Sequence, residues 1–312
     1  MKKIVVLIVV LLFGLWLSGT SAQNKNGFDL SDALIHPNEI FSGGPARDGI
    51  PAIDTPRFVR AQDSDHLRAS DAVLGIVFQG IAKAYSINIL NWHEIVNDRF
   101  NNAPVVITFC PLCGSGMAYA AKIDGIAHTF GVSGLLYNSD VLLYDRQTQS
   151  LWSQLMAQAV SGSLKGRRLQ SLPLSHTTWQ DWKSRHPDTL VLSPDTGYAR
   201  DYRASPYADY ITSPQLWFPV AQSSKRFHPK EQVLGIEING HFKAYPFVEL
   251  EKTAGAFTDM VKGQQLLIRY DNEHRSGSIF DQRGNQVPAT TTFWFAWYAF
   301  HPGTEIFSAT KQ

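Results

Sequence analysis

A repeated block of eight residues constrains the fold more than any other feature of this sequence. The block recurs 160 residues further along with every residue kept: Val73 to Ile76, Gly80 and Lys83 to Tyr85 in the first copy, Val233 to Ile236, Gly240 and Lys243 to Tyr245 in the second. Both copies have the pattern of a β-hairpin, and the second has an Asn-Gly turn between its strands. Self-similarity at a fixed offset indicates a duplicated unit.

The similarity of the two copies extends beyond the hairpins. Each hairpin is followed by a segment with helical character, residues 86–98 and 246–257, and then by an apolar, strand-like run, residues 105–109 and 266–270. We therefore predict a β-rich α+β fold with two degenerate internal repeats, each with a β-hairpin, a helix and a further strand. The expected divisions are a signal peptide (1–22), an extended N-terminal arm (23–72), a first repeat (73–192), a connector (193–232) and a second repeat (233–312).

The amino terminus has the pattern of an export signal. Lys2 and Lys3 precede an apolar run from Ile4 to Leu17, and small residues lead to a predicted cleavage site after Ala22. Fourteen apolar residues match a signal-peptide core and fall short of the about 20 that a membrane span needs. We expect an exported, soluble protein of the periplasm or the extracellular space. The alternative is an uncleaved amino-terminal anchor.

Charge and hydropathy restrict the partners of the mature chain. Removing Lys2 and Lys3 from the 28 basic residues leaves 26, against 27 acidic ones. A balance so close to neutral gives no reason to expect nucleic acid or an anionic membrane surface as a partner. No second long apolar run follows the signal, so no membrane span is expected in the mature chain. The partner is expected to be a small molecule or a metal.

The two copies differ most at the end of the apolar strand. The first runs into Cys110-Pro111-Leu112-Cys113, and the second into Asp271-Asn272-Glu273-His274. These are the only two cysteines, too few for a disulfide framework in an exported chain of this size. The pair is therefore free for another role, and a simple local disulfide is the alternative. Because only the first copy has the cysteines, they are the better candidates for function.

Metal binding is the leading interpretation of the Cys-x-x-Cys pair. Thiolates are soft ligands, and the metals to consider in an exported protein are copper and zinc. A closed zinc site needs four ligands, so other side chains must contribute. The candidates are His93 on the helix before the strand, His128 on the hairpin after it, and the thioether of Met117. Covalent haem is disfavoured because Gly114 stands where that motif requires histidine.

Two catalytic alternatives use the same cysteines. In a thiol–disulfide oxidoreductase, Cys110 and Cys113 would exchange through mixed disulfides, but the βαβ pattern of a thioredoxin-like domain is absent here. In a hydrolase or transferase, Cys110 would be the nucleophile, His93 its base and Glu94 the partner of that base. Glu94 points about 100° away from His93 on a helix, which disfavours this triad.

A fourth, non-catalytic interpretation is a binding module. The aromatic segment from Phe293 to Trp297 would line its pocket. Alternation along this segment equally describes a strand buried on both faces. Core packing is the favoured account of these rings.

Several long motifs together resemble one family. They are Asp48 to Pro51, Leu90 to Asp98, Thr108 to Gly116, Phe130 to Asp140, Ser150 to Gln154, Phe293 to Trp297 and His301-Pro302. This combination resembles the domain-of-unknown-function 3179 family of prokaryotes and covers most of the mature chain. The resemblance implies a family and no activity, so function has to be argued from the residues.

Overall fold

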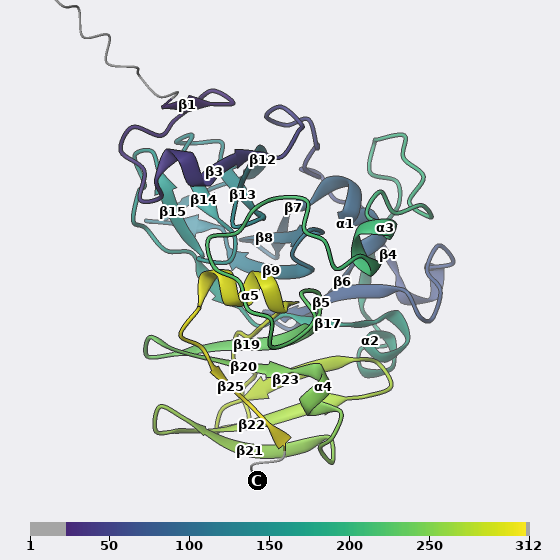
Figure 1. The fold of residues 1–312 in the computed structure, drawn as a ribbon. Coiled ribbons are helices and arrows are strands. Elements are labelled where there is room, and N and C mark those ends of the chain that lie inside the picture. The colour runs from purple at the N-terminus through teal and green to yellow at the C-terminus, as the bar shows by residue number, and fades with distance from the viewer. Residues whose placement is uncertain (1–22, 310–312) are drawn as a thin grey trace, which may run out of the picture.

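The computed structural model describes residues 23–309 (Figure 1). Most of the regular structure in this range is strand, and no helix within it is longer than seven residues. The predicted β-rich class is therefore confirmed. The predicted signal peptide, residues 1–22, lies outside the described residues. Within the described range, no helix has both the length and the apolar character needed to cross a membrane.

Each half of the chain contains a sheet built on the repeated hairpin. The strands of these two sheets are β4 (Phe58–Arg60), β5 (Ala72–Phe78), β6 (Ile81–Ser86), β17 (Ser175–Thr178), β18 (Leu190–Leu192), β19 (Gln232–Ile238), β20 (His241–Pro246), β24 (Thr290–Phe293) and β25 (Glu305–Ile306). The strand order is β17-β5-β6-β18-β4 in the first sheet and β24-β19-β20-β25 in the second. β18 pairs in parallel with β6, and β25 pairs in parallel with β20. The repeated block thus lies at the centre of two sheets in which four strands follow the same order, with β4 as an additional edge strand in the first.

The hairpin turns have the geometry that the sequence predicts. Asn239 and Gly240 have φ angles of 52° and 75°, and Gln79 and Gly80 have 50° and 75°. Positive φ at both central residues is typical of the type I′ turn, whose twist matches that of the flanking strands. The Asn-Gly signal of the second copy is confirmed, and Gln-Gly adopts the same turn in the first.

The helix after the first hairpin is shorter than predicted. α1 spans Ile87–His93, whereas the sequence predicted helix as far as Asp98. That extension is wrong, because the chain continues as the strand β7 (Ile95–Phe100). The helix ends where Glu94 takes a φ of 58°, outside the right-handed helical region.

The helix after the second hairpin is shorter still. α4 spans only Phe247–Leu250, and the prediction of helix as far as Phe257 is wrong. The chain turns at Gly255, whose φ is 88°, and enters the strand β21 (Ala256–Val261). In the first half, the β-branched residues Ile95 and Val96 near the end of the predicted helix begin the following strand instead.

A second pair of sheets carries the apolar strands of the two halves. Their further strands are β8 (Ala103–Cys110), β9 (Ser115–Ala120), β16 (Gln170–Leu172), β22 (Gln264–Asp271) and β23 (Ser276–Phe280). The strand orders are β16-β9-β8-β7 and β21-β22-β23. Cys110 pairs with Ser115 in the first sheet, and Asp271 pairs with Ser276 in the second. The turn that carries Cys113 therefore corresponds to the turn that carries His274.

The first half also contains an inserted sheet, at the top of Figure 1. Its strands are β3 (Ile40–Ser42), β12 (Phe130–Tyr137), β13 (Asp140–Asp145), β14 (Leu151–Ser153) and β15 (Gln158–Ser161), in the order β15-β14-β13-β12-β3. The small hairpin that precedes it is formed by β10 (Lys122–Ile123) and β11 (Ile126–Ala127), around a turn at Asp124 and Gly125. Strands β3 and β4 come from the amino-terminal arm and lie at sheet edges. The remaining arm elements are β1 (Asn24–Lys25), β2 (Phe28–Asp29) and the 3₁₀ turns η1 (Pro37–Glu39) and η2 (Ala61–Asp63).

A tryptophan on a late helix packs on a hairpin glycine in each half. The two helices are α2 (Trp179–Arg185) and α5 (Trp294–Phe300). A Cβ atom added to Gly75 would lie 2.2 Å from the Trp182 ring, and one added to Gly235 would lie 2.2 Å from the Trp297 ring. The absence of a side chain at these two positions therefore lets the helix approach the sheet closely.

The aromatic segment from Phe293 to Trp297 is not a strand along its length. Only Phe293 belongs to β24, and α5 begins at Trp294. The alternation predicted for a strand buried on both faces is therefore wrong, because these rings follow helical geometry. Their side chains are buried, so the favoured account of core packing is correct.

The repeated Lys-Ala-Tyr motif anchors the hairpin to the neighbouring sheet. Lys83 Nζ donates to Asp98 Oδ1 at 2.9 Å, and the Tyr85 hydroxyl donates to Asp98 Oδ2 at 2.5 Å. The second half repeats the arrangement. Lys243 Nζ lies 2.7 Å from Asp259 Oδ2, and the Tyr245 hydroxyl donates to the same oxygen at 2.9 Å. The motif shared by the two copies is therefore explained by the fold.

The two halves pack on each other reciprocally. β24 of the second half lies beside β9 of the first, and β17 of the first lies beside β23 of the second. Thr292 Oγ1 and the Phe293 amide both donate to the Cys113 carbonyl at 2.8 Å. On the other side, Thr178 Oγ1 lies 2.9 Å from His274 Nδ1. Each half thus supports the turn after the apolar strand of the other half.

Candidate metal centre

Both cysteines are buried, reduced thiols at the end of a strand. Cys110 is the last residue of β8, and Cys113 lies in the following turn, where its amide donates to the Cys110 carbonyl at 3.2 Å. The next residue, Gly114, has a φ of 61°, which lets the chain reverse into β9. The two thiols are not joined, so the local disulfide is absent. The exposed fraction is 1% for Cys110 and 0% for Cys113.

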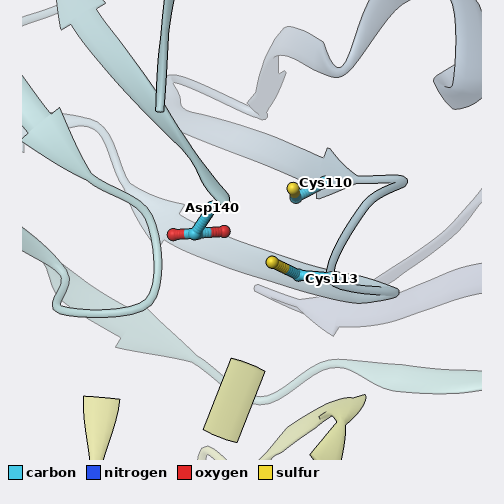
Figure 2. Close-up of side chains that lie close together, drawn as sticks. All are labelled: Cys110, Cys113 and Asp140. Atoms are coloured by element: carbon cyan, nitrogen blue, oxygen red, sulfur yellow. The ribbon is translucent and has the colours of Figure 1, made fainter. Parts of the chain in front are cut away.

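A carboxylate from the inserted sheet meets the two thiols. Asp140 is the first residue of β13 and follows a tight turn in which Asn138 and Ser139 have φ angles of 51° and 63°. One ligand atom from each of Cys110, Cys113 and Asp140 lies within 4.8 Å of the other two. Figure 2 shows the three side chains gathered in one place from different segments of the chain. We call this group the thiol–carboxylate cluster.

The cluster is an unfavourable place for several negative charges. Burial raises the pKa of the Asp140 carboxyl to about 7. Burial also raises the pKa of the Cys110 thiol and, further, that of the Cys113 thiol. The neutral thiols lie 3.8 Å and 3.4 Å, respectively, from the Ser139 carbonyl oxygen, to which they donate. Without a cation, the three groups therefore favour their protonated forms.

One carboxylate oxygen in the cluster has no hydrogen-bond partner. Asp140 Oδ2 accepts from the Leu155 amide at 3.0 Å. Asp140 Oδ1 is buried and has no partner among residues 23–309. An unsatisfied buried polar atom is costly and calls for an explanation such as a bound ion. The second oxygen of Asp140 is therefore available to a ligand.

Glu94 is a second buried acid beside the cluster. Its amide donates to the Leu90 carbonyl, and its carbonyl accepts from the Phe109 amide, both at 2.7 Å. These two bonds hold Glu94 in its left-handed conformation next to the strand that ends at Cys110. Burial, followed by the charge of Asp140, raises the pKa of Glu94 to about 8.

The raised pKa of Glu94 predicts a pH-dependent stability of the metal-free protein. Between pH 6 and pH 8 the folded state keeps a proton that the unfolded chain, with a Glu pKa of about 4.3, has already lost. This contribution to stability is therefore lost as the pH rises through about 8, by about 2 kcal/mol between pH 6 and pH 8. Urea unfolding of wild type and Glu94→Gln at both pH values measures it.

Glu94→Gln is expected to lose the part of the pH dependence that Glu94 contributes. It should keep the part that Asp140 contributes, because the raised pKa of Asp140 also makes the stability fall as the pH rises. Glu39→Gln, at an exposed position, is the control and should follow the wild type. Equal pH dependence in wild type and Glu94→Gln would contradict the buried, protonated state of Glu94.

A segment of the connector covers the cluster. We call residues 207–221 the site cover; it includes helix α3 (Ala208–Thr212). Tyr207, Tyr210 and Phe218 from this segment pack in the same apolar core as the two cysteines. Ser139 Oγ donates to the Phe218 carbonyl at 2.8 Å, and the Ala221 amide donates to Asn138 Oδ1 at 2.7 Å. The turn that positions Asp140 therefore also holds the cover.

Comparison with known families agrees with the resemblance seen in the sequence. The family model described as "Protein of unknown function (DUF3179)" matches residues 47–286. The chain belongs to the DUF3179 family. No curated protein and no solved structure matched the chain. The matched range contains the thiol–carboxylate cluster and the site cover, and it stops before β24 and α5.

In this DUF3179 protein, the imidazole of His93, predicted as a metal ligand, makes its contacts with other residues than the cysteines. His93 Nδ1 lies 2.8 Å from the Pro51 carbonyl oxygen, and Nε2 lies 2.7 Å from the Tyr202 hydroxyl. The ring also packs against Tyr198 and Tyr202. With both nitrogens engaged, His93 fits the role of a buried bridge between the amino-terminal arm and the connector.

The other two predicted ligands also have partners elsewhere. His128 Nδ1 lies 3.1 Å from Asp145 Oδ1, at the far end of β13 from Asp140. The Met117 sulfur accepts from Thr290 Oγ1 at 3.4 Å. Neither histidine belongs to a group of three metal-ligand side chains among residues 23–309. Of the four cysteines and histidines predicted from sequence, the structure brings only the two cysteines together in such a group.

Asp140 is the functional candidate that sequence reasoning missed. It lies 27 residues after Cys113, in a separate sheet, so chain proximity does not connect it to the pair. One signal could have indicated it: Asp140 directly precedes the apolar run Val141 to Tyr144, and this run forms a strand that is buried along its length. Buried carboxylates require a partner or a cation.

The corresponding turn of the second half holds a different cluster. Asp271 and His274, which match Cys110 and Cys113 in position, lie within 4.8 Å of Asp181 on α2. Asp181 already accepts from Arg185 Nε at 2.9 Å and from Thr177 Oγ1 at 2.6 Å. The Arg185 guanidinium therefore offsets the negative charge of this cluster, whereas no such contact is seen at the thiol–carboxylate cluster within residues 23–309.

Proposed function

We propose that this DUF3179 protein binds a transition-metal ion, zinc in the first place, through Cys110, Cys113 and Asp140. The observation that carries the proposal is the meeting of three acidic ligand groups within 4.8 Å in a buried position. Three such groups gain a common stabilising partner when a divalent cation replaces their protons. His93 is not required as a ligand in this proposal.

The donor set favours zinc over copper. Two thiolates and one carboxylate combine soft and hard ligands, and Zn²⁺ accepts both kinds, with distances of about 2.3 Å to sulfur and about 2.0–2.2 Å to oxygen. Cu(I) prefers sulfur and nitrogen and gains little from a carboxylate. The free Oδ1 of Asp140 supplies the oxygen without breaking an existing hydrogen bond. Three protein ligands leave a fourth position open.

Burial favours metal binding over thiol exchange. A thiol that exchanges with disulfides must be ionised and accessible, and both cysteines have raised pKa values and almost no exposed surface. A nucleophilic role for Cys110 would need a base, and the imidazole of His93 is engaged by Pro51 and Tyr202.

We also propose that the protein is exported and that its signal peptide is removed. An exported protein meets oxidising conditions, and a bound metal would keep the two thiols from forming a disulfide. Mass analysis of protein from the exported fraction should find a chain that begins at Gln23, and a retained residue 1 would contradict cleavage.

The matching strand orders support descent of both halves from one unit. An experimental structure in which β5–β9 fails to superpose on β19–β23 would contradict this descent.

Metal content tests the metal proposal directly. Wild-type protein is expected to hold one zinc per chain after purification, measured by elemental analysis. Asp140→Asn should weaken zinc binding by more than the roughly 10- to 100-fold that outer-shell changes cause, because a ligand is lost. Competition with a chromogenic zinc chelator measures the affinity.

Met117→Leu is the matched control, because it removes a thioether close in sequence to the cysteines and nearly conserves volume. It should bind zinc like the wild type. Wild-type protein without stoichiometric metal, and without affinity for added zinc or copper, would refute the proposal.

A further inference from the structure

Gln154 joins the sheet that carries the cysteines to the sheet that carries Asp140. It follows β14 of the inserted sheet and is 0% exposed. Its Oε1 accepts from Ser115 Oγ at 2.7 Å, and its Nε2 donates to Thr108 Oγ1 at 2.8 Å and to the Ser115 carbonyl at 3.3 Å. Thr108 lies on β8, and Ser115 begins β9, where it pairs with Cys110. The side-chain amide of Gln154 is thus bound to both strands at the end where the thiol of Cys110 lies.

The backbone at Gln154 is bound to the strand that starts with the carboxylate. The amide of the next residue, Leu155, donates to Asp140 Oδ2 at 3.0 Å, and the Gln154 amide donates to the Val141 carbonyl at 3.4 Å. From the other sheet, the Tyr119 hydroxyl on β9 donates to the Gln154 carbonyl. A buried polar network whose members all have partners fixes one arrangement of the groups that it joins. Gln154 therefore sets where Asp140 lies relative to the cysteine strand.

The position of the carboxylate matters to some metals more than to others. Zinc accepts ligands within a narrow range of distances, about 2.3 Å for sulfur and about 2.0–2.2 Å for carboxylate oxygen. Because the three proposed ligands come from two sheets, the spacing of the sheets decides whether one zinc ion can reach all three. Cu(I) prefers soft ligands, and two thiolates can hold it without the carboxylate. A link between the sheets therefore favours zinc in particular.

We propose that Gln154 is a positioning residue that shifts the metal preference of the site towards zinc and away from Cu(I). The inference rests on the proposed function and adds which residue sets the preference between the two metals. Gln154 holds Asp140 beside the thiols, so zinc gains its third protein ligand without rearrangement of the sheets. Cu(I) held by Cys110 and Cys113 gains nothing from this link.

The test measures zinc and Cu(I) affinities of the full chain in wild type and Gln154→Met, by competition with a chelator for each metal. Methionine keeps the unbranched shape of glutamine and cannot make the hydrogen bonds of its amide. The variant should bind zinc about 10- to 100-fold more weakly, the usual effect of losing an outer-shell partner. Its affinity for Cu(I) should stay within about threefold of the wild type. A general packing defect would weaken the binding of both metals together.

A double-mutant cycle shows whether Gln154 acts through Asp140. In the Asp140→Asn background, Gln154→Met should change the zinc affinity by less than about threefold, because the ligand that Gln154 positions is already lost. An equal loss of zinc affinity in both backgrounds would contradict the assigned role.

Ser115→Ala keeps the experiment informative if Gln154→Met does not fold. It removes only the hydroxyl that donates to Gln154 Oε1 and should weaken zinc binding about 3- to 10-fold, the net effect of one hydrogen bond, with Cu(I) binding unchanged. Thermal unfolding of each variant shows whether the fold is kept.

Gln158→Met is the matched control, because the amide of Gln158 on β15 donates to the Gly166 carbonyl at 3.1 Å. It should bind both metals like the wild type. Unchanged zinc affinity in Gln154→Met, or equal losses for zinc and Cu(I), would overturn the inference and leave the metal site standing. Failure of the wild type to bind either metal would refute both proposals.

Discussion

Replacing Cys110 and Cys113 together by serine is expected to abolish the stabilisation that zinc gives to the folded protein. Zinc held by the native cluster binds the folded state and not the unfolded chain, so at 1,000 times its dissociation constant it adds about 4 kcal/mol to the free energy of unfolding. Serine keeps the shape of the side chain and can donate to the Ser139 carbonyl as the thiols do. It cannot supply a thiolate. Guanidinium unfolding with and without zinc measures the difference.

The effect of zinc on the wild type should also grow with pH. The thiols of Cys110 and Cys113 must release protons to bind the metal, and burial has raised the pKa of both. Each proton released gives up to about a tenfold gain in apparent affinity per pH unit. Zinc stabilisation that persists in the double variant would contradict the assignment. His274→Ala would then show whether the metal binds at Asp181, Asp271 and His274 instead.

Replacing Asp98 by asparagine is expected to cost about 3 kcal/mol of folding stability. Asp98 faces Lys83, and their side chains are 6% and 8% exposed. Asparagine keeps the shape but removes the charge, which leaves a buried ammonium without a counter-ion; breaking such a pair typically costs about 3–5 kcal/mol. Urea unfolding of the variant in the presence of a metal chelator measures this cost separately from any effect at the cysteines.

The second half supplies a matched control for this prediction. Asp259→Asn removes the corresponding carboxylate, but Lys243 keeps a second partner, since its Nζ lies 2.7 Å from Glu305 Oε1. Asp259 is also more exposed, at 18% of its side chain. The expected loss is about 1 kcal/mol, in the range of a partly solvated ion pair. Equal losses in the two variants would show that the charge of Asp98 is not what stabilises the first hairpin.

The architecture was predictable where it depends on local rules. The hairpins follow from alternating apolar residues and from turns with glycine at a position of positive φ, and both signals lie within a few residues. Helix length was not predictable, because the end of α1 depends on Glu94 in a left-handed conformation that few non-glycine residues adopt. The site cover likewise lies in a polar connector, whose packing on the cysteines has no periodic signal.

The candidate site was predictable only in part, for a geometric reason. Cys110 and Cys113 stand out because they occur in one copy alone. Asp140 reaches them from a different sheet, and no short-range pattern relates the two sheets. His93 is closer along the chain than Asp140 is, yet its ring lies between Pro51 and Tyr202. Chain distance was therefore a poor guide to which side chains meet.

The reciprocal packing of the halves has a consequence for how this chain can be divided. All three proposed ligands belong to the first half, and a chain that ended at the connector would retain them. It would lose Thr292 and Phe293, whose donors hold the Cys113 carbonyl, and the Phe293 ring that packs beneath Gly114. The turn that presents the second thiol would then be free to move. The ligands are thus encoded by one half, while the rigidity that gives them a defined geometry is supplied by the other.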